Sequence, residues 1–157
     1  MRPFTIRDAT PADRSFVMDT VRRLAAFGPP PWRTAEEVVA GEVRSLERFF
    51  ATPDPGARLL IAQDASHVAA AFVYLEVLRD YFSGETHGHI GILAVAAAAE
   101  GRGAAAALLR AAEDWARAQR FRKLTLNTFE GNLRARRLYE HVDYRLEILR
   151  YVKLLEG

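Results

Sequence analysis

The chain has 157 residues, half of them hydrophobic, which predicts a single domain over residues 1–157 with a substantial buried core. It has no cysteine, so disulfides, thiolate zinc sites and a cysteine acyl-enzyme are excluded, and a cytoplasmic location is favoured. The formal net charge is only +2 and the longest apolar run, residues 68–75, is too short to span a bilayer. We therefore expect neither a nucleic acid nor a membrane as a partner.

The first half of the sequence predicts a short strand, two helices and a hairpin. Apolar residues recur at helical spacing on both sides of a Gly-Pro-Pro-Pro break, and two apolar runs separated by a polar turn follow. The predicted elements are a strand at 3–7, a helix from Thr10 to the break at 28–31, a helix from Thr34 to about Phe50, and antiparallel strands at 58–63 and 68–78. We interpret the break as a rigid spacer that buries Trp32.

The second half is organised around a strand that runs through a small-residue turn directly into an Ala/Leu helix. The predicted elements are a polar loop at 80–88, a strand at 89–95, a helix from 104 to about 119, a strand at 123–128, a helix at 132–141 and a final strand at 144–154. A strand, helix, strand order predicts a right-handed crossover, so the strands at 89–95 and 123–128 should pair in parallel.

The turn before the Ala/Leu helix has the features of an anion site. Backbone N–H groups at a helix N-terminus lack intrahelical partners, and Gly101 and Gly103 would let a phosphate approach the chain closely. Tight packing of the helix on the strand is an equally good explanation of these residues alone. A nucleotide P-loop is excluded because Gly103 is followed by Ala104 and Ala105, and Ala106 stands where a dinucleotide fold needs its third glycine.

Two segments together resemble the GCN5-related N-acetyltransferase (GNAT) superfamily. Residues 93–109, LAVAAAAEGRGAAAALL, resemble its acyl-CoA-binding motif Arg/Gln-x-x-Gly-x-Gly/Ala, although Glu100 stands in the first position. Either Glu100 points to solvent and Arg102 supplies the cation, or cofactor affinity is weakened. Residues 132–144 resemble the family segment Asn-x-x-Ala-x-x-Leu-Tyr-x-x-x-Gly-Tyr/Phe, with Asp143 in the glycine position, where a left-handed backbone is expected.

The resemblance implies an α/β (α+β) fold with a mixed, mostly antiparallel sheet of about six or seven strands and about four helices. It implies transfer of an acetyl group from acetyl-CoA to a primary amine of a small molecule, by direct attack in a ternary complex without a metal. By analogy it also implies a homodimer. The implied cofactor-binding residues are Leu93, Val95, Glu100, Gly101, Arg102, Gly103, Ala104, Ala105, Asn132 and Arg136.

The resemblance also implies catalytic roles. Tyr139 would protonate the departing thiolate, and Val95 N–H would hold the thioester oxygen. The family's frequent carboxylate site is Gly91 here, so the base candidates are His89 first, then His87 and Glu76. Both histidines share the parity of Leu93 unless a bulge intervenes.

Several alternatives stay open. The histidines could face solvent at a strand boundary, and Glu76 could be an outward residue. The connection at 27–33 could line the acceptor side. Because Glu100, Gly91 and Asp143 depart from the family pattern, the alternative function is a catalytically silent acyl-CoA-binding module.

Overall fold

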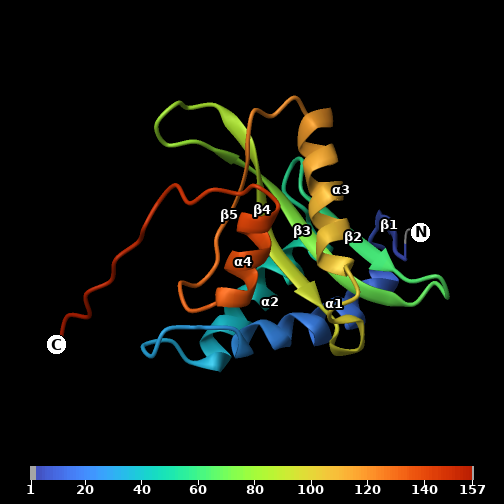
Figure 1. Cartoon of the computed structure of the whole chain (residues 1–157), viewed down its shortest axis with the longest axis horizontal. Helices are drawn as coiled ribbons and strands as arrows, with labels where there is room; N and C mark the ends of the chain where they lie inside the picture. Colours follow the sequence, from blue (N-terminus) through green and yellow to red (C-terminus); the bar gives the residue numbers. More distant parts are fainter. Residues whose placement is uncertain (1–2, 157) are drawn as a thin grey trace.

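The computed structural model describes residues 3–156, which form one mixed sheet with helices on both faces (Figure 1). The strands are β1 (Thr5–Asp8), β2 (Arg58–Gln63), β3 (Ala69–Arg79), β4 (Thr86–Val95) and β5 (Leu124–Leu126). The helices are α1 (Arg14–Val21), α2 (Ala35–Ala51), α3 (Ala104–Ala118) and α4 (Leu133–His141), with 3₁₀ turns η1 (Pro11–Asp13), η2 (Arg22–Ala26) and η3 (Ala97–Ala99). Within the described residues no helix has both the length and the apolar character needed to cross a membrane.

The sheet order is β1-β2-β3-β4-β5, and every pair is antiparallel except β4 with β5. The predicted parallel crossover through α3 is therefore confirmed. The α/β class with about four helices is confirmed as well.

Two apolar clusters, one on each face of the sheet, hold the layers together. Residues of α3 and α4 pack on one face, where Leu108, Leu109 and Trp115 are buried. Residues of α1 and α2 pack on the other face, around Leu46, Phe72 and Tyr74. Figure 1 shows α3 and α4 in front of the strands and α2 behind them. The sheet, with the ends of β4 and β5, is therefore held between two helical layers.

A bulge at Gly91 interrupts the pairing of β3 with β4. Tyr74 pairs with Ile92 and Leu75 with Ile90, which leaves Gly91 as the extra residue on β4. A bulge reverses which face the following side chains occupy. Ile90 packs with Leu93 and Val95 in the α3 cluster, so His89 faces the opposite side, toward α2. The shared parity expected for His89 and Leu93 is therefore absent.

Three expectations are wrong. The predicted strand at 144–154 does not form, and residues 3–156 contain five strands rather than six or seven. A strand needs a hydrogen-bonded neighbour, and this segment does not pair with β5. Trp32 is 46% exposed rather than buried, because its connection lies at the surface. The element at 123–128 is shorter than predicted, since β5 pairs only with residues 88–90 of β4.

Candidate active site

The end of β4 has a free edge. Ala96 N–H donates to Ala70 O at 2.8 Å, so by the alternation of an antiparallel ladder the N–H and C=O of Val95 face away from β3. β5 ends at Leu126, opposite Ile90. No strand of residues 3–156 therefore covers Val95 on that side, and its N–H can donate to an outside group. An extended ligand could add there in the manner of a strand.

The turn after β4 presents further donors. Gly101 and Gly103 adopt φ angles of 71° and 90°, which other residues rarely tolerate. The first bond of α3 runs from Ala107 N–H to Gly103 O at 3.1 Å, so the N–H groups of residues 104–106 have no intrahelical acceptor. A Cβ on either glycine would meet nothing within 4 Å, so the space beside both glycines is open. The donors, the open space and the positive end of the helix fit a diphosphate.

Glu100 is held by two arginines from distant parts of the chain. Its Oε1 lies 2.6 Å from Arg23 Nη2 and 3.4 Å from Arg134 Nη1, and the hydrogen bond with Arg23 lowers the pKa of the carboxyl below its usual value. Arg23 also donates to Val95 O. Arg102 instead stacks over the Phe4 ring, 5.5 Å from its centroid. The first arrangement expected for Glu100 is therefore not found, because its carboxylate pairs with Arg23 and Arg134 while Arg102 lies over Phe4.

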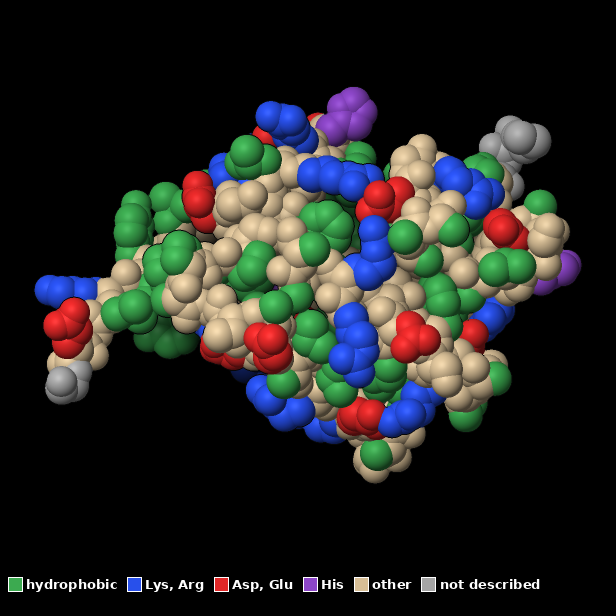
Figure 2. Space-filling model, turned by 90° about the horizontal axis from the view of Figure 1, so that it is seen from below, with side chains coloured by type: hydrophobic (Ala, Val, Ile, Leu, Met, Phe, Trp, Pro, Cys, Tyr) green, Lys and Arg blue, Asp and Glu red, His purple; other side chains and the backbone are tan. Residues whose placement is uncertain are grey.

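Arg23 could not be found by motif reading, because it lies 77 residues before Glu100. Figure 2 shows basic and acidic side chains interspersed on the face seen from below, rather than a patch of one sign. Charge at the turn is therefore balanced by specific pairs, and opening one pair would change the local potential.

The two histidines of β4 share one partner on β5. His89 Nδ1 lies 2.8 Å and His87 Nε2 lies 3.1 Å from Thr125 Oγ1. His87 is 7% and His89 9% exposed, so the interpretation of them as solvent-facing is wrong. Burial lowers the pKa of both imidazoles, which favours their neutral, proton-accepting form. Thr125 carried no signal in the sequence because its role depends on the β4–β5 pairing.

Glu76 lies on the same face of the sheet, opposite His89 in the β3–β4 ladder. Its carboxylate sits over the backbone of Gly91, and burial raises its pKa above the usual value. Burial raises the pKa of Glu42 on α2, and the negative charge of Glu76 raises it further. The α2 face of the sheet therefore carries two carboxylates and two imidazoles. Sequence reading missed Glu42, which looked like any polar helix residue.

The helix predicted at 132–141 forms as α4, with Asn132 as its N-cap. Asn132 Oδ1 accepts from Ala135 N–H at 3.1 Å and caps the helix. Arg136 Nη1 donates to Glu130 O at 2.9 Å. Asp143, at the other end of the helix, has a φ of 67°, which confirms the expected left-handed backbone.

Tyr139 packs from α4 against the α3 cluster. Its ring centroid lies 5.9 Å from that of Tyr144, and burial raises its pKa to about 12. The phenol therefore keeps its proton throughout the neutral range and is available as a donor.

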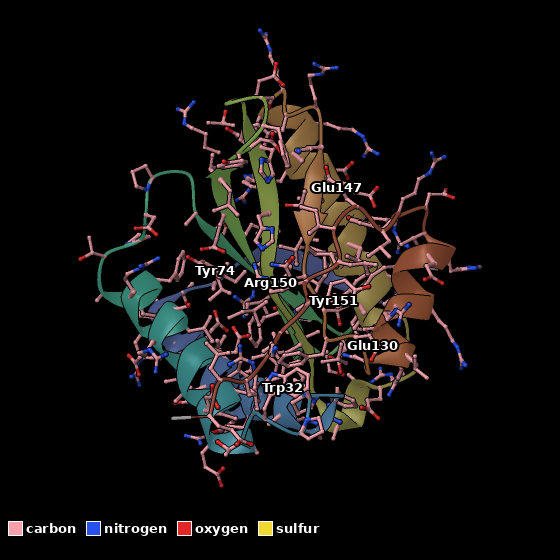
Figure 3. The ribbon with its side chains drawn as sticks, turned by 90° about the vertical axis from the view of Figure 1, so that its left-hand side faces the viewer. Trp32, Tyr74, Glu130, Glu147, Arg150 and Tyr151 are labelled. Atoms are coloured by element: carbon pink, nitrogen blue, oxygen red, sulfur yellow. The ribbon has the colours of Figure 1, made fainter. Side chains whose placement is uncertain are left out.

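A close backbone contact joins the α1–α2 connection to the start of α4. A Cβ on Gly28 would come within 2.5 Å of Asn132 N, so only glycine fits. Figure 3 shows Trp32, from the same connection, and Glu130, from the turn before α4, on the side of the molecule that faces the viewer. The connection at 27–33 thus borders the end of the site where α4 begins.

The ion pair of Glu100 with Arg134 brings the start of α4 beside the turn after β4, next to the open edge of that strand. Residues 20–144 match the family model described as Acetyltransferase (GNAT) family. The chain belongs to the GNAT family of acetyltransferases, enzymes that use acetyl-CoA. A comparison with curated proteins gives no match.

Three solved structures have the same fold. A putative acetyl transferase from Pyrococcus furiosus is 22% identical with a TM-score of 0.77, covering 97% of this chain and 99% of that one. A ribosomal-protein-alanine N-acetyltransferase from Brucella melitensis biovar Abortus 2308 is 22% identical with a TM-score of 0.70, over 97% and 99%. The aminoglycoside N-acetyltransferase AAC(6')-Iy in complex with CoA is 17% identical with a TM-score of 0.67, over 96% and 94%. At these identities the likeness shows the fold alone.

Proposed function

We propose that this protein transfers an acetyl group from acetyl-CoA to a primary amine of a small molecule, by direct attack within a ternary complex. Two sets of backbone donors carry the proposal: the outward N–H of Val95, and the N–H groups of residues 104–106, which have no intrahelical acceptor. Arg23 links the two places, because it donates both to Val95 O and to Glu100. Acetyl-CoA, when bound, supplies a thioester carbonyl that an amine can attack. Binding of the cofactor and transfer of protons are the roles of the protein's own backbone and side-chain groups.

The proposed binding residues are those of the free edge and the turn. Gly101, Gly103, Ala104 and Ala105 would donate backbone N–H groups to the diphosphate, with Arg23 and Arg134 as the nearby cations. Leu93 and Val95 would bond the pantetheine arm through their outward backbone groups, and Val95 N–H would hold the thioester oxygen. The side-chain amide of Asn132 and the Arg136 guanidinium complete the proposed set at α4. Glu100 and Arg102 act indirectly, through Arg23 and through Phe4.

The proposed proton acceptors are Glu76 and His89. An alkyl ammonium has a pKa near 10, so an amine must lose a proton before it attacks. The raised pKa of Glu76 makes its carboxylate a stronger base than an exposed glutamate, and His89 is buried in its neutral form. Three carboxylates, those of Glu42, Asp54 and Glu76, lie within electrostatic reach of one another with Arg48 as the neighbouring cation, and this net negative charge favours a cationic acceptor on that side.

Tyr139 is the proposed proton donor to the departing thiolate. Its phenol keeps its proton up to a pKa of about 12, and it lies on α4 beyond the free edge of β4. This donor lies on the α3 side of the sheet, whereas the acceptors lie on the α2 side. Opposite faces suit a reaction in which the amine attacks the carbonyl from one side and forms the C–N bond, while the C–S bond breaks and the thiolate leaves toward the other side.

The test is steady-state release of CoA thiol over a panel of small amines, comparing the wild type with Tyr139→Phe. We expect turnover with at least one amine and a loss of kcat of about 10²-fold or more in the variant, with acetyl-CoA affinity kept. Tyr144→Phe is the matched control, because it removes a hydroxyl from the neighbouring ring. Tight acetyl-CoA binding without turnover of any amine would support the silent binding module instead.

A further inference from the structure

One hydroxyl group on β5 joins the two buried imidazoles of β4. Thr125 stands opposite His89 in the parallel β4–β5 pairing, and its Oγ1 lies 2.8 Å from His89 Nδ1 and 3.1 Å from His87 Nε2. Burial lowers the pKa of both imidazoles, so each ring is in its neutral form at neutral pH. A neutral imidazole has one donor nitrogen and one acceptor nitrogen. The position of the ring proton therefore decides whether His89 can accept a proton in the reaction.

The hydroxyl of Thr125 limits where these protons can lie. A hydroxyl has a single proton to donate and two lone pairs that accept. Its third neighbour is Gly88 O, but that separation of 3.5 Å is longer than the usual O–H···O distance of about 2.5–3.0 Å. Thr125 therefore donates to one imidazole and accepts a hydrogen bond from the other. Two arrangements remain, with the hydroxyl proton directed either to His89 Nδ1 or to His87 Nε2.

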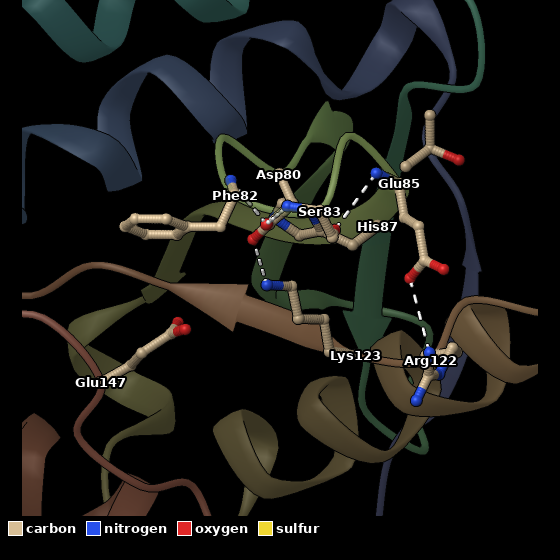
Figure 4. A pocket seen from close by; sticks show the side chains of 9 residues that line it. Asp80, Phe82, Ser83, Glu85, His87, Arg122, Lys123 and Glu147 are labelled. Carbon is tan, nitrogen blue, oxygen red and sulfur yellow. Dashed lines mark hydrogen bonds and ion pairs between the residues drawn. The ribbon is translucent and has the colours of Figure 1, made fainter.

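The other nitrogen of His87 has no partner. His87 Nδ1 is buried and has no hydrogen-bond partner among residues 3–156. The ring borders a cavity at the start of β5 that also carries charged side chains (Figure 4). These charges are paired with each other: Lys123 donates to Asp80, and Arg122 Nη1 lies 3.7 Å from Glu85 Oε2. None of these pairs includes His87.

This unpartnered nitrogen distinguishes the two arrangements. If Thr125 donated to His87 Nε2, the single proton of that ring would lie on Nδ1, as a buried N–H without an acceptor. Buried N–H groups of this kind are rare, and bare acceptors are tolerated more often. In the other arrangement Nδ1 is a bare nitrogen, and His87 donates from Nε2 to the hydroxyl. The geometry therefore favours the arrangement in which the hydroxyl proton points to His89.

We propose that Thr125 is a positioning residue whose hydroxyl accepts from His87 Nε2–H and donates to His89 Nδ1. His89 then carries its proton on Nε2, and neither of its ring nitrogens is free to accept another. The three side chains form one chain of hydrogen bonds that runs in a single direction, from His87 on one side to His89 on the other. Only the β4–β5 pairing brings them together.

The consequence for the reaction rests on the proposed function. Glu76 lies opposite His89 in the β3–β4 ladder, on the same face of the sheet. Because His89 presents a donor there, the carboxylate of Glu76 is the proton acceptor on this face. An N–H bond of the substrate ammonium breaks, an O–H bond forms on Glu76, and the lone pair of the amine becomes free to attack the thioester carbonyl. His89 contributes a hydrogen-bond donor beside the reacting groups.

The first test locates the imidazole protons. In isotope-labelled protein without ligand, protonated and bare ring nitrogens have different chemical shifts, and the sequence has only four histidines. The variants His87→Gln and His89→Gln assign the two sets of signals. At neutral pH we expect the proton on Nε2 in both rings. A proton on His89 Nδ1 in the wild type would overturn the proposal.

Variants of Thr125 test its positioning role in the same measurement. Thr125→Val keeps the shape of the side chain and removes the hydroxyl, so a population of His89 with its proton on Nδ1 should appear. Thr125→Ser retains a hydroxyl and should restore the wild-type distribution. Thr128→Val is the matched control, because Thr128 is exposed beyond the end of β5, and it should change nothing. A distribution that Thr125→Val leaves unaltered would overturn the proposal.

Steady-state release of CoA thiol tests the consequence for catalysis. Glutamine can present an amide N–H in place of His89 Nε2–H, whereas alanine cannot, so His89→Gln should lose less kcat than His89→Ala. Equal losses of about 10²–10⁴-fold, as for removal of a base, would overturn the assignment of Glu76 as the acceptor. Unchanged circular dichroism and acetyl-CoA affinity would show that the variants fold. If no amine is turned over, the proposed function fails, and the imidazole shifts still decide the role of Thr125.

Discussion

The carboxylate of Glu76 occupies the space that a side chain at position 91 would need. A Cβ on Gly91 would lie 2.6 Å from Glu76 Oε2 and 3.2 Å from Tyr74 Cδ1. Gly91 is also the bulged residue of β4, so the bulge and the missing side chain together bring a carboxylate from β3 onto the middle of β4. The chain thus has a carboxylate beside the strand position where the family frequently carries one, supplied by the neighbouring strand.

Gly91→Ala should therefore reduce activity by displacing Glu76. We expect kcat to fall about tenfold for the variant and about 10²-fold for Glu76→Gln, because a positioned proton acceptor contributes about 10²–10⁴-fold. The melting temperature should change little, since the crowded atom is the end of a flexible side chain. Steady-state CoA release measures the rates. A double variant slower than Glu76→Gln alone would show that Gly91 acts by another route.

The pH dependence of activity should follow the pKa of Glu76. The carboxylate must be ionised to accept a proton, so activity should be lost as the pH falls through its raised pKa. Arg48 lowers that pKa and Asp54 raises it, although the two form one ion pair at 2.7 Å. Arg48→Gln should move the acid limb of kcat/KM to higher pH, and Asp54→Asn should move it to lower pH. Equal shifts of the acid limb in the same direction for the two variants would contradict the assignment of Glu76 as the proton acceptor.

Glu100→Gln should strengthen the binding of CoA. The variant removes a negative charge from the turn and frees Arg23 and Arg134 for a diphosphate. Because exposed ion pairs are weak and are screened by salt, Kd should fall by only about two- to fivefold at low salt. Glu113→Gln is the matched control, since it removes the same charge from α3 where the carboxylate pairs with Arg117. Titration calorimetry measures the Kd of CoA for both variants. An equal change in Kd for Glu100→Gln and Glu113→Gln would contradict the role of Glu100.

Gly28→Ala should destabilise the protein more than Gly84→Ala. Both glycines have positive φ angles, 75° and 72°, so both substitutions carry a backbone cost of about 1–2 kcal/mol. At Gly28 the added Cβ would also strike the backbone at Gly131 and Asn132, whereas at Gly84 nothing lies within 4 Å. Urea unfolding should give a lower free energy of unfolding for Gly28→Ala than for Gly84→Ala. Gly28→Ala should also weaken the binding of acetyl-CoA, because the contact of Gly28 with the backbone at Gly131 and Asn132 fixes the start of α4. Gly84→Ala should leave that binding unchanged.

Local features of the site could be predicted from the sequence. The left-handed turn at Gly101 and Gly103, the cap at Asn132 and the left-handed Asp143 all follow from backbone preferences of single residues. The parallel crossover follows from the order of the elements and the handedness of their connection. Two motifs at the family spacing were enough to indicate the family, because each motif lies within one short segment.

Features that join distant segments required the tertiary structure. The bulge at Gly91 reversed the face of His89, and the pairing of Arg23 with Glu100 spans 77 residues. The predicted strand at 144–154 had the right alternation, but alternation does not decide whether a segment pairs, and no strand follows α4 among the described residues. Sequence by itself determines which backbone shapes and faces are favoured. Which groups actually meet is decided by packing, because contact energies depend on all the segments that share the space.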